Sequence, residues 1–194
     1  MPETANTAIK VCSRACLLAG IEPITSFADG TAESDICNAM YEDIAQSSLT
    51  NTRWRFATNQ SVLNRIATPP TARFSAAYQL PSGTLTVSAV TVNGNVIEFD
   101  TYGNKIYCDA SSTDEVIADY IFRSPEAEWP AYFIIAVEYA MASVLAISAL
   151  RDASMSQILT QRAAVLMLEA RSRDSQRQTT RRLNTSRFIA QRRT

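Results

Sequence analysis

The segment 131–150, AYFIIAVEYAMASVLAISAL, constrains this chain most, because it is apolar almost all the way round a helix. Trp129-Pro130 comes directly before it, and proline suits the first position of a helix, where its missing N–H would have no partner. A helix that is apolar on every side has to be buried, either in a protein core or in a bilayer. The segment therefore predicts a central helix at about 130–150.

The same segment is long enough to cross a membrane, so both environments have to be weighed. Glu138 lies in the middle of the segment, several alanines and two serines dilute its hydropathy, and no basic cluster flanks Trp129. Each of these features disfavours a bilayer. We expect a fully buried helix in a helical bundle and no membrane partner, with a membrane span as the alternative.

Two segments in the first fifty residues have helical periodicity. The first, at about 4–19, is followed by Gly20, a common helix stop. The second, at about 32–51, has Thr31 as a candidate N-cap. Their predicted apolar faces are Ala5, Ala8, Ile9, Cys12, Cys16 and Ala19 for the first, and Ile36, Cys37, Met40, Tyr41, Ile44 and Ala45 for the second.

A fourth helix is expected at about 153–176. Its predicted buried face consists of Met155, Ile158, Leu159, Ala163, Leu166 and Ala170. The apolar pattern ends at Ala170, and the sequence beyond it is rich in Arg, Gln, Thr and Ser. Such a composition cannot build a core of its own, so we expect this end of the chain to become ordered against a partner.

Between the second and third helices the sequence changes character. Residues from about 73 to 122 are rich in Val, Ile, Thr and Tyr, with turn residues between the runs. Asn93-Gly94 separates two such runs and predicts a two-residue hairpin, because both central residues of a type I′ turn need positive φ. We expect four or five antiparallel strands here.

These patterns predict an α+β fold, an antiparallel four-helix bundle with an inserted antiparallel β-domain. The folded domain would cover residues 1–178, and residues 179–194 would form an extended C-terminal arm. The N-terminus lacks the basic start and apolar run of a signal peptide, and four cysteines suit buried reduced thiols. We therefore expect synthesis in a reducing cytoplasm.

Charge is divided unevenly along the chain. Residues 1–170 hold ten Lys and Arg against eighteen Asp and Glu, a net charge of −8. Residues 171–194 hold eight Arg against the single Asp174, a net charge of +7. A basic tail on an acidic body predicts an acidic partner: nucleic acid, anionic lipid, or a protein, including another copy of the chain.

Groups for covalent chemistry are scarce in the sequence. The chain has no histidine, so neither a Ser-His-Asp nor a Cys-His nucleophile can be assembled, and no phosphate-binding glycine motif occurs. Cys12 and Cys16 lack two further ligands at metal-like spacing. We expect no enzymatic activity, no cofactor and no metal, and assign structural roles to the carboxylate pairs Asp114-Glu115 and Glu126 with Glu128.

The motif RWRF, residues 53–56, mixes cations with aromatic rings. Such a mixture stacks on bases in single-stranded nucleic-acid binding. It also follows the second helix directly, where a tryptophan commonly closes a core. We expect Trp54 and Phe56 to be core residues.

The order of several motifs resembles a known family, the head-to-tail adaptor proteins of tailed bacteriophages, of the type called tail tubular protein A. The first helix ends in CLLAGIEPITSF (16–27), similar to the family's "aLxxlGExPI" pattern. An amphipathic helix and the W-x-F of Trp54 and Phe56 follow. The run 73–94 is similar to the "Y-x-LP-x-x-xLxV" strand pair, and VIADYIFR (116–123) precedes an alanine-rich helix, as in the family.

This resemblance implies a ring of twelve copies beneath the capsid portal, extending the DNA channel and offering a docking surface to the next tail or nozzle protein. The protein would assemble in the bacterial cytoplasm and reside at the head-tail junction of the virion. Its arm would dock on the portal, with apolar anchors among acid-pairing arginines. The candidate portal-binding residues are Arg181, Arg182, Leu183, Arg187, Phe188, Ile189, Arg192 and Arg193.

A second function remains open, that of a nucleic-acid-binding module in which the same arginines neutralise phosphates. The acidic body opposes it, since a net charge of −8 repels a duplex. A combined version, in which a protein ring makes transient non-specific contact with passing DNA, is also compatible with the sequence.

Overall fold

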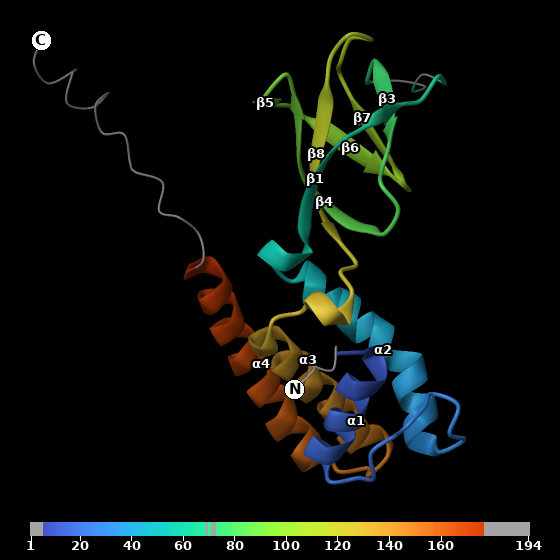
Figure 1. Ribbon diagram of the computed structural model, residues 1–194, viewed down its shortest axis with the longest axis vertical. Coiled ribbons are helices and arrows are strands. Elements are labelled where there is room, and N and C mark those ends of the chain that lie inside the picture. Colours follow the sequence, from blue (N-terminus) through green and yellow to red (C-terminus); the bar gives the residue numbers. More distant parts are fainter. Residues whose placement is uncertain (1–5, 69, 71–72, 177–194) are drawn as a thin grey trace, which may run out of the picture.

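A computed structural model describes residues 6–68, 70 and 73–176 of the chain. They form a mixed α+β fold with four α-helices and two antiparallel four-stranded sheets. Figure 1 shows an elongated molecule, with the helices gathered at one end and the strands at the other. All of the strands lie between the second and third helices in the sequence.

The helical end is organised around α3 (Ala131–Ser148), which packs on the other three helices: α1 (Ala8–Ala19), α2 (Ala32–Thr50) and α4 (Ala153–Gln176). Ten side chains of α3 are buried, among them Phe133, Val137 and Met141. Among the described residues α3 is the one helix that is long and apolar enough to cross a membrane, and the core helix of a globular protein meets the same test. The sequence thus located the central helix correctly.

The boundaries of two helices differ from those expected. The first helix begins at Ala8 instead of residue 4, because Thr7 is its N-cap and accepts a hydrogen bond from the Lys10 N–H. The third helix spans Ala131–Ser148, shorter than 130–150, with Pro130 at the N-cap position. The predicted Thr31 cap of α2 and the extent of α4 are confirmed.

Three expectations about helix faces are wrong. Ile158, expected in the buried face of α4, is 66% exposed, because α3 is the main packing partner of α4 and covers only one side of it. Met40 of α2 is 38% exposed. α3 is not fully buried, since Ile135 and Ile147 face outward.

The strands form two sheets. The first has the order β1 (Thr58–Val62), β8 (Val116–Phe122), β4 (Thr84–Val92), β5 (Asn95–Val96). The second has the order β2 (Asn64–Arg65), β3 (Ala76–Gln79), β7 (Lys105–Cys108), β6 (Phe99–Tyr102). Side chains from both sheets, including Tyr78, Val90, Ile106 and Ala118, meet in a second core separate from that of the helices.

The predicted hairpin at Asn93-Gly94 is confirmed. Val92 pairs with Asn95 across the turn, and both turn residues have positive φ, 50° at Asn93 and 82° at Gly94. The expected start of the strand region at 73 is wrong, because β1 and β2 already lie at 58–65. The chain folds into eight strands in its described part, more than the four or five expected.

Arg123 joins the strand end to the helical end of the molecule. It follows β8, its Nε and Nη2 donate to the two carboxylate oxygens of Glu42 on α2 at 2.8 and 3.0 Å, and Nη2 also donates to Glu126. The guanidinium lies 5.2 Å from the centre of the Trp129 ring, within the range of a cation–π contact. A second pair, Arg53 with Asp119 of β8 at 2.8 Å, bridges the same junction.

Candidate functional site

The eight residues predicted to bind the portal, Arg181, Arg182, Leu183, Arg187, Phe188, Ile189, Arg192 and Arg193, lie outside the described residues. The structure does describe the point from which their segment starts. That point is the last turn of α4, at the junction of the helices and strands (Figure 1).

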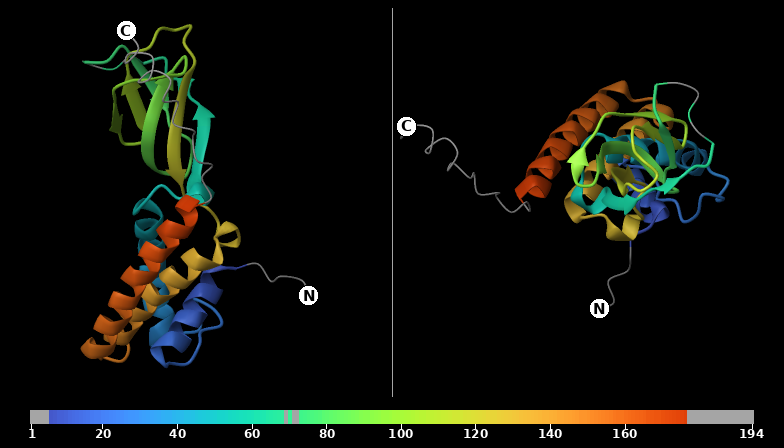
Figure 2. Two further views of the ribbon diagram at one scale, coloured as in Figure 1. Left: turned by 90° about the vertical axis from the view of Figure 1, so that its left-hand side faces the viewer. Right: turned by 90° about the horizontal axis from the view of Figure 1, so that it is seen from above.

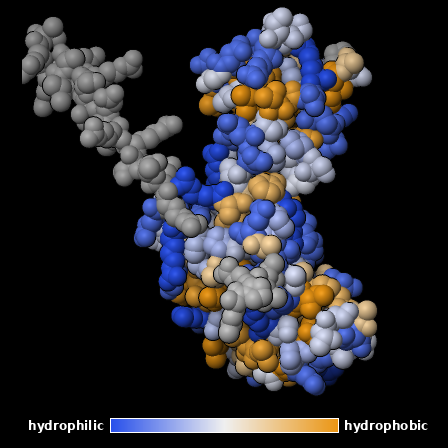
Figure 3. All heavy atoms as spheres, viewed as in Figure 1, coloured by the Kyte–Doolittle hydropathy of each residue, from blue (hydrophilic) through white to orange (hydrophobic). Residues whose placement is uncertain are grey.

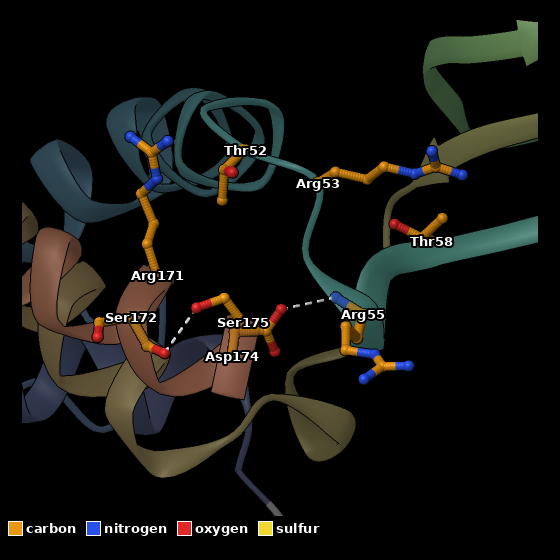
Figure 4. A pocket seen from close by; sticks show the side chains of 8 residues that line it. All are labelled: Thr52, Arg53, Arg55, Thr58, Arg171, Ser172, Asp174 and Ser175. Carbon is orange, nitrogen blue, oxygen red and sulfur yellow. Dashed lines mark hydrogen bonds between the residues drawn. The ribbon is translucent and has the colours of Figure 1, made fainter. Parts of the chain in front are cut away.

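An open cleft of about 680 Å³ lies beside this last turn. Figure 4 shows that one wall comes from the C-terminal end of α4 and the other from the segment between α2 and β1. The lining residues are all polar or charged: Thr52, Arg53, Arg55, Thr58, Arg171, Ser172, Asp174 and Ser175. Three arginines against a single acid make the cleft basic, and the arginine-rich segment 177–194 follows directly from it in the sequence.

Asp174 fixes the end of α4 against the cleft's other wall. The residue is 4% exposed, and its carboxylate accepts hydrogen bonds from the Tyr132 hydroxyl at 2.8 Å and the Arg55 backbone N–H at 3.0 Å. Burying a carboxylate is costly unless donors satisfy it, and here two elements supply them, the first turn of α3 and the segment after α2. The last turn of α4, which precedes the arginine-rich segment in the sequence, is therefore held in a defined position.

The cleft arginines do not converge on one point. Arg53 forms an ion pair with Asp119, which also accepts a hydrogen bond from Gln60 at 2.6 Å. Arg55 and Arg171 are exposed, and Figure 4 shows the three guanidinium groups spread around the cleft. This arrangement suits an extended acidic surface better than one small anion.

The RWRF motif divides between core and cleft. Trp54 is fully buried, its indole N–H donates to the Ser48 carbonyl at 2.9 Å, and its ring meets Phe133 edge-on at 5.0 Å. Phe56 is half-buried, 4.9 Å from Phe133 between ring centres. The expectation that both rings belong to the core is confirmed, and Trp54 has no face open for stacking on a base.

One carboxylate of each pair weighed for acid–base chemistry, Glu126 and Asp114, has structural partners. Burial acts to raise the pKa of Glu126, but the hydrogen bond and charge of Arg123, the backbone N–H of Glu126 and the Tyr41 hydroxyl together outweigh it, and the pKa lies below its usual range. The pKa of Asp114 is lowered by the Ser111 backbone N–H and the Asn93 side chain. Within residues 6–68, 70 and 73–176, no cluster of three Cys, Asp or Glu suited to a metal ion occurs.

All four cysteines are free and buried, as expected. Burial raises the pKa of Cys16 and of Cys108 to about 11. Thiols of this kind stay protonated at neutral pH and behave as small apolar core residues.

Sequence reasoning missed Asp174 and the cleft. One signal was present: an acid in the last turn of a helix faces the negative end of the helix dipole, where cations are the favoured residues. Asp174 stands among arginines at that position. Its unfavourable place on the helix is compensated by donors from segments 119 and 42 residues away in the sequence.

The fold and cleft define a mixed α+β protein with a basic surface at the start of its C-terminal segment. Neither a protein-family model nor a curated protein matches this sequence.

Proposed function

We propose that the protein is a structural head-to-tail adaptor of a tailed phage, without enzymatic activity. In this role it forms a ring beneath the portal, extends the DNA channel and presents a docking surface to the next tail or nozzle protein. We further propose that α1 to α4 act as one antiparallel bundle, with the strands of 58–122 as an inserted β-domain. The protein would reside at the head-tail junction of the virion.

The observation that carries the proposal is the fixed position of the last turn of α4, directly before the basic segment in the sequence. Asp174 ties the last turn of α4 to α3 and to the segment at Arg55, and the cleft beside it already carries three arginines. A docking arm needs a rigid point of attachment, because movement of that point spreads the anchors over a larger volume and lowers their effective concentration at the partner. The arm's arginines would pair with portal acids, and Phe188 and Ile189 would fill an apolar groove.

Deleting residues 179–194 tests this function. We expect the truncated chain to keep its far-ultraviolet circular dichroism and to lose binding to portal rings in a co-sedimentation assay. The variant F188A/I189A separates the apolar anchor from charge, with R192A/R193A as its matched pair. Portal binding that survives the deletion would contradict the role of the arm.

Nucleic-acid binding is a second candidate, favoured by the exposed Arg55 and Arg171 beside the tail. Binding through phosphates weakens steeply with salt, by roughly a thousandfold or more between 50 and 200 mM when six or more phosphates are contacted. A filter-binding measurement at low salt distinguishes the candidates. Tight, salt-sensitive DNA binding that is lost with R55A/R171A would favour this second function, whereas weak contact fits DNA passing through a ring.

A further inference from the structure

The outward face of α4 carries an unpartnered apolar stripe. Ile158, Val165 and Leu168 are 66%, 45% and 63% exposed, and their spacings of seven and three residues place them on one side of the helix. The buried residues Leu159, Ala163 and Ala170 lie on the other side, against α3. Figure 3 shows apolar residues at the surface along the lower part of α4 and hydrophilic ones toward its upper end.

Single exposed apolar residues are ordinary, but three along one face of a helix with spacings of this kind suit packing against another helix. The helix has 24 residues and so is about 36 Å long, enough for a contact of several turns. Arg162, Glu169 and Arg173, which flank the stripe, are all exposed and give its border a net charge of +1. The stripe thus calls for a partner helix that is acidic and has small residues along its centre.

The outward face of α2 has this chemistry. α2 contains Glu33, Asp35, Glu42 and Asp43 and no Lys or Arg. Ala32, Ala39, Asp43 and Thr50 are exposed at spacings of seven, four and seven residues, so small side chains and an acid share one face with the exposed Gln46. Met40, beside them, is 38% exposed.

α2 and α4 both pack on α3 and lie on either side of it, as the views of Figures 1 and 2 agree. Each copy therefore presents the basic, apolar stripe on one flank and the acidic, small-residue face on the other. We infer that the stripe of α4 in one copy packs against the outward face of α2 in a second copy. Such a contact joins two different surfaces, so it repeats from copy to copy and closes into a ring where the rotation allows.

This inference rests on the proposed ring for its closure, while the contact itself is argued from burial, spacing and charge. The test compares Val165→Asp on α4 with Ala39→Glu on α2, each placing a charge in the middle of one face. Val96→Asp is the matched control, an exposed valine, 74% accessible, on β5 of the strand end. All four chains are compared by sedimentation velocity over a range of concentrations.

We expect the wild type and V96D to associate alike, and V165D and A39E each to need at least a tenfold higher concentration for half association. An equimolar mixture of V165D and A39E should form dimers, because A39E keeps an intact α4 stripe and V165D keeps an intact α2 face. If V165D does not retain the wild-type melting temperature, Ile158→Asp replaces it.

Three results would overturn the contact: a wild type that stays monomeric at every concentration, association of A39E at wild-type concentrations, or association of V165D at wild-type concentrations. An A39E chain that still associates while V165D does not would indicate a symmetric contact between two α4 helices. Portal binding is measured separately through the arm deletion. If the copies do not associate but portal binding is intact, the contact between α4 and α2 is wrong and the adaptor function stands. If the copies associate through this contact but do not bind the portal, the adaptor function is wrong and the contact stands.

Discussion

The carboxylate of Asp174 accepts a hydrogen bond from the Tyr132 hydroxyl at 2.8 Å, which ties the last turn of α4 to the first turn of α3. The same carboxylate accepts the Arg55 N–H, so three segments of the chain meet at one buried acid. Because the basic C-terminal segment begins three residues later, the place from which it departs depends on this acid.

Replacing Asp174 with alanine should lower the free energy of unfolding by about 1–3 kcal/mol, because the Arg55 N–H and the Tyr132 hydroxyl both lose this acceptor. Chemical denaturation measures the change. Glu169→Ala, at an exposed acid on the same helix, is the control and should change stability by no more than about 0.5 kcal/mol. Equal effects of the two substitutions would show that Asp174 does not anchor the helix.

The Arg123 junction predicts a loss of stability in acid. The pKa of Glu126 lies below its usual value in the folded chain, so the unfolded chain takes up this proton at a higher pH. The stabilisation that the ionised Glu126 gives to the folded chain is complete above the unfolded pKa of about 4.3 and is lost as the pH falls. In the Glu126→Gln variant the free energy of unfolding should therefore fall less steeply as the pH is lowered. Glu128→Gln, at an exposed neighbour, is the control and should follow the wild-type curve.

Glu138 should change stability with pH in the opposite direction to Glu126. Its side chain is buried in α3, and burial raises its pKa despite the ion pair with Arg14 at 2.8 Å. The folded chain then keeps this proton to a higher pH than the unfolded chain, so the contribution is present at low pH and is lost as the pH rises through the raised pKa. The stability of Glu138→Gln relative to wild type should increase between about pH 4 and pH 7. A difference that decreases over this range would contradict the assignment.

The four cysteines should not react with thiol reagents in the folded protein. All are buried with no exposed surface, so a reagent cannot reach their sulfur atoms. Burial also raises the pKa of Cys16 and Cys108 to about 11, whereas the hydrogen bond from Cys12 lowers the pKa of Cys37. We expect an aromatic disulfide reagent at pH 8 to label none of them in the native state within minutes, and all four in guanidinium. Rapid labelling of a native thiol would show that one of these helices or strands opens readily.

The sequence predicted those elements whose signals are local. The Thr31 cap, the Asn93-Gly94 turn and the extent of α4 follow from neighbouring residues, and all are confirmed. β1, TNQSV, was missed because it is a polar edge strand that pairs only with β8, so it lacks the apolar alternation of an inner strand. Ile158 was misassigned because its exposure depends on where α4 packs, which the period of a single helix does not specify.

The candidate site could also be predicted only in part from the sequence. The charge asymmetry and the basic C-terminal segment can be seen in the sequence, whereas the cleft cannot, because it forms where residues 52–58 meet residues 171–175. The core role of Trp54 was predicted correctly from its place after a helix. The partner of Asp174 was beyond prediction, since Tyr132 lies 42 residues earlier on another helix.

The central claim, that this protein is an adaptor, is tested most directly by mixing it with portal rings and measuring the mass of the complex, with negative-stain images of the same sample. We expect a second ring stacked on the portal and a mass increase by a whole number of copies of the 21.3 kDa chain. A portal ring of unchanged mass and outline, at concentrations where the chain is folded, would contradict it.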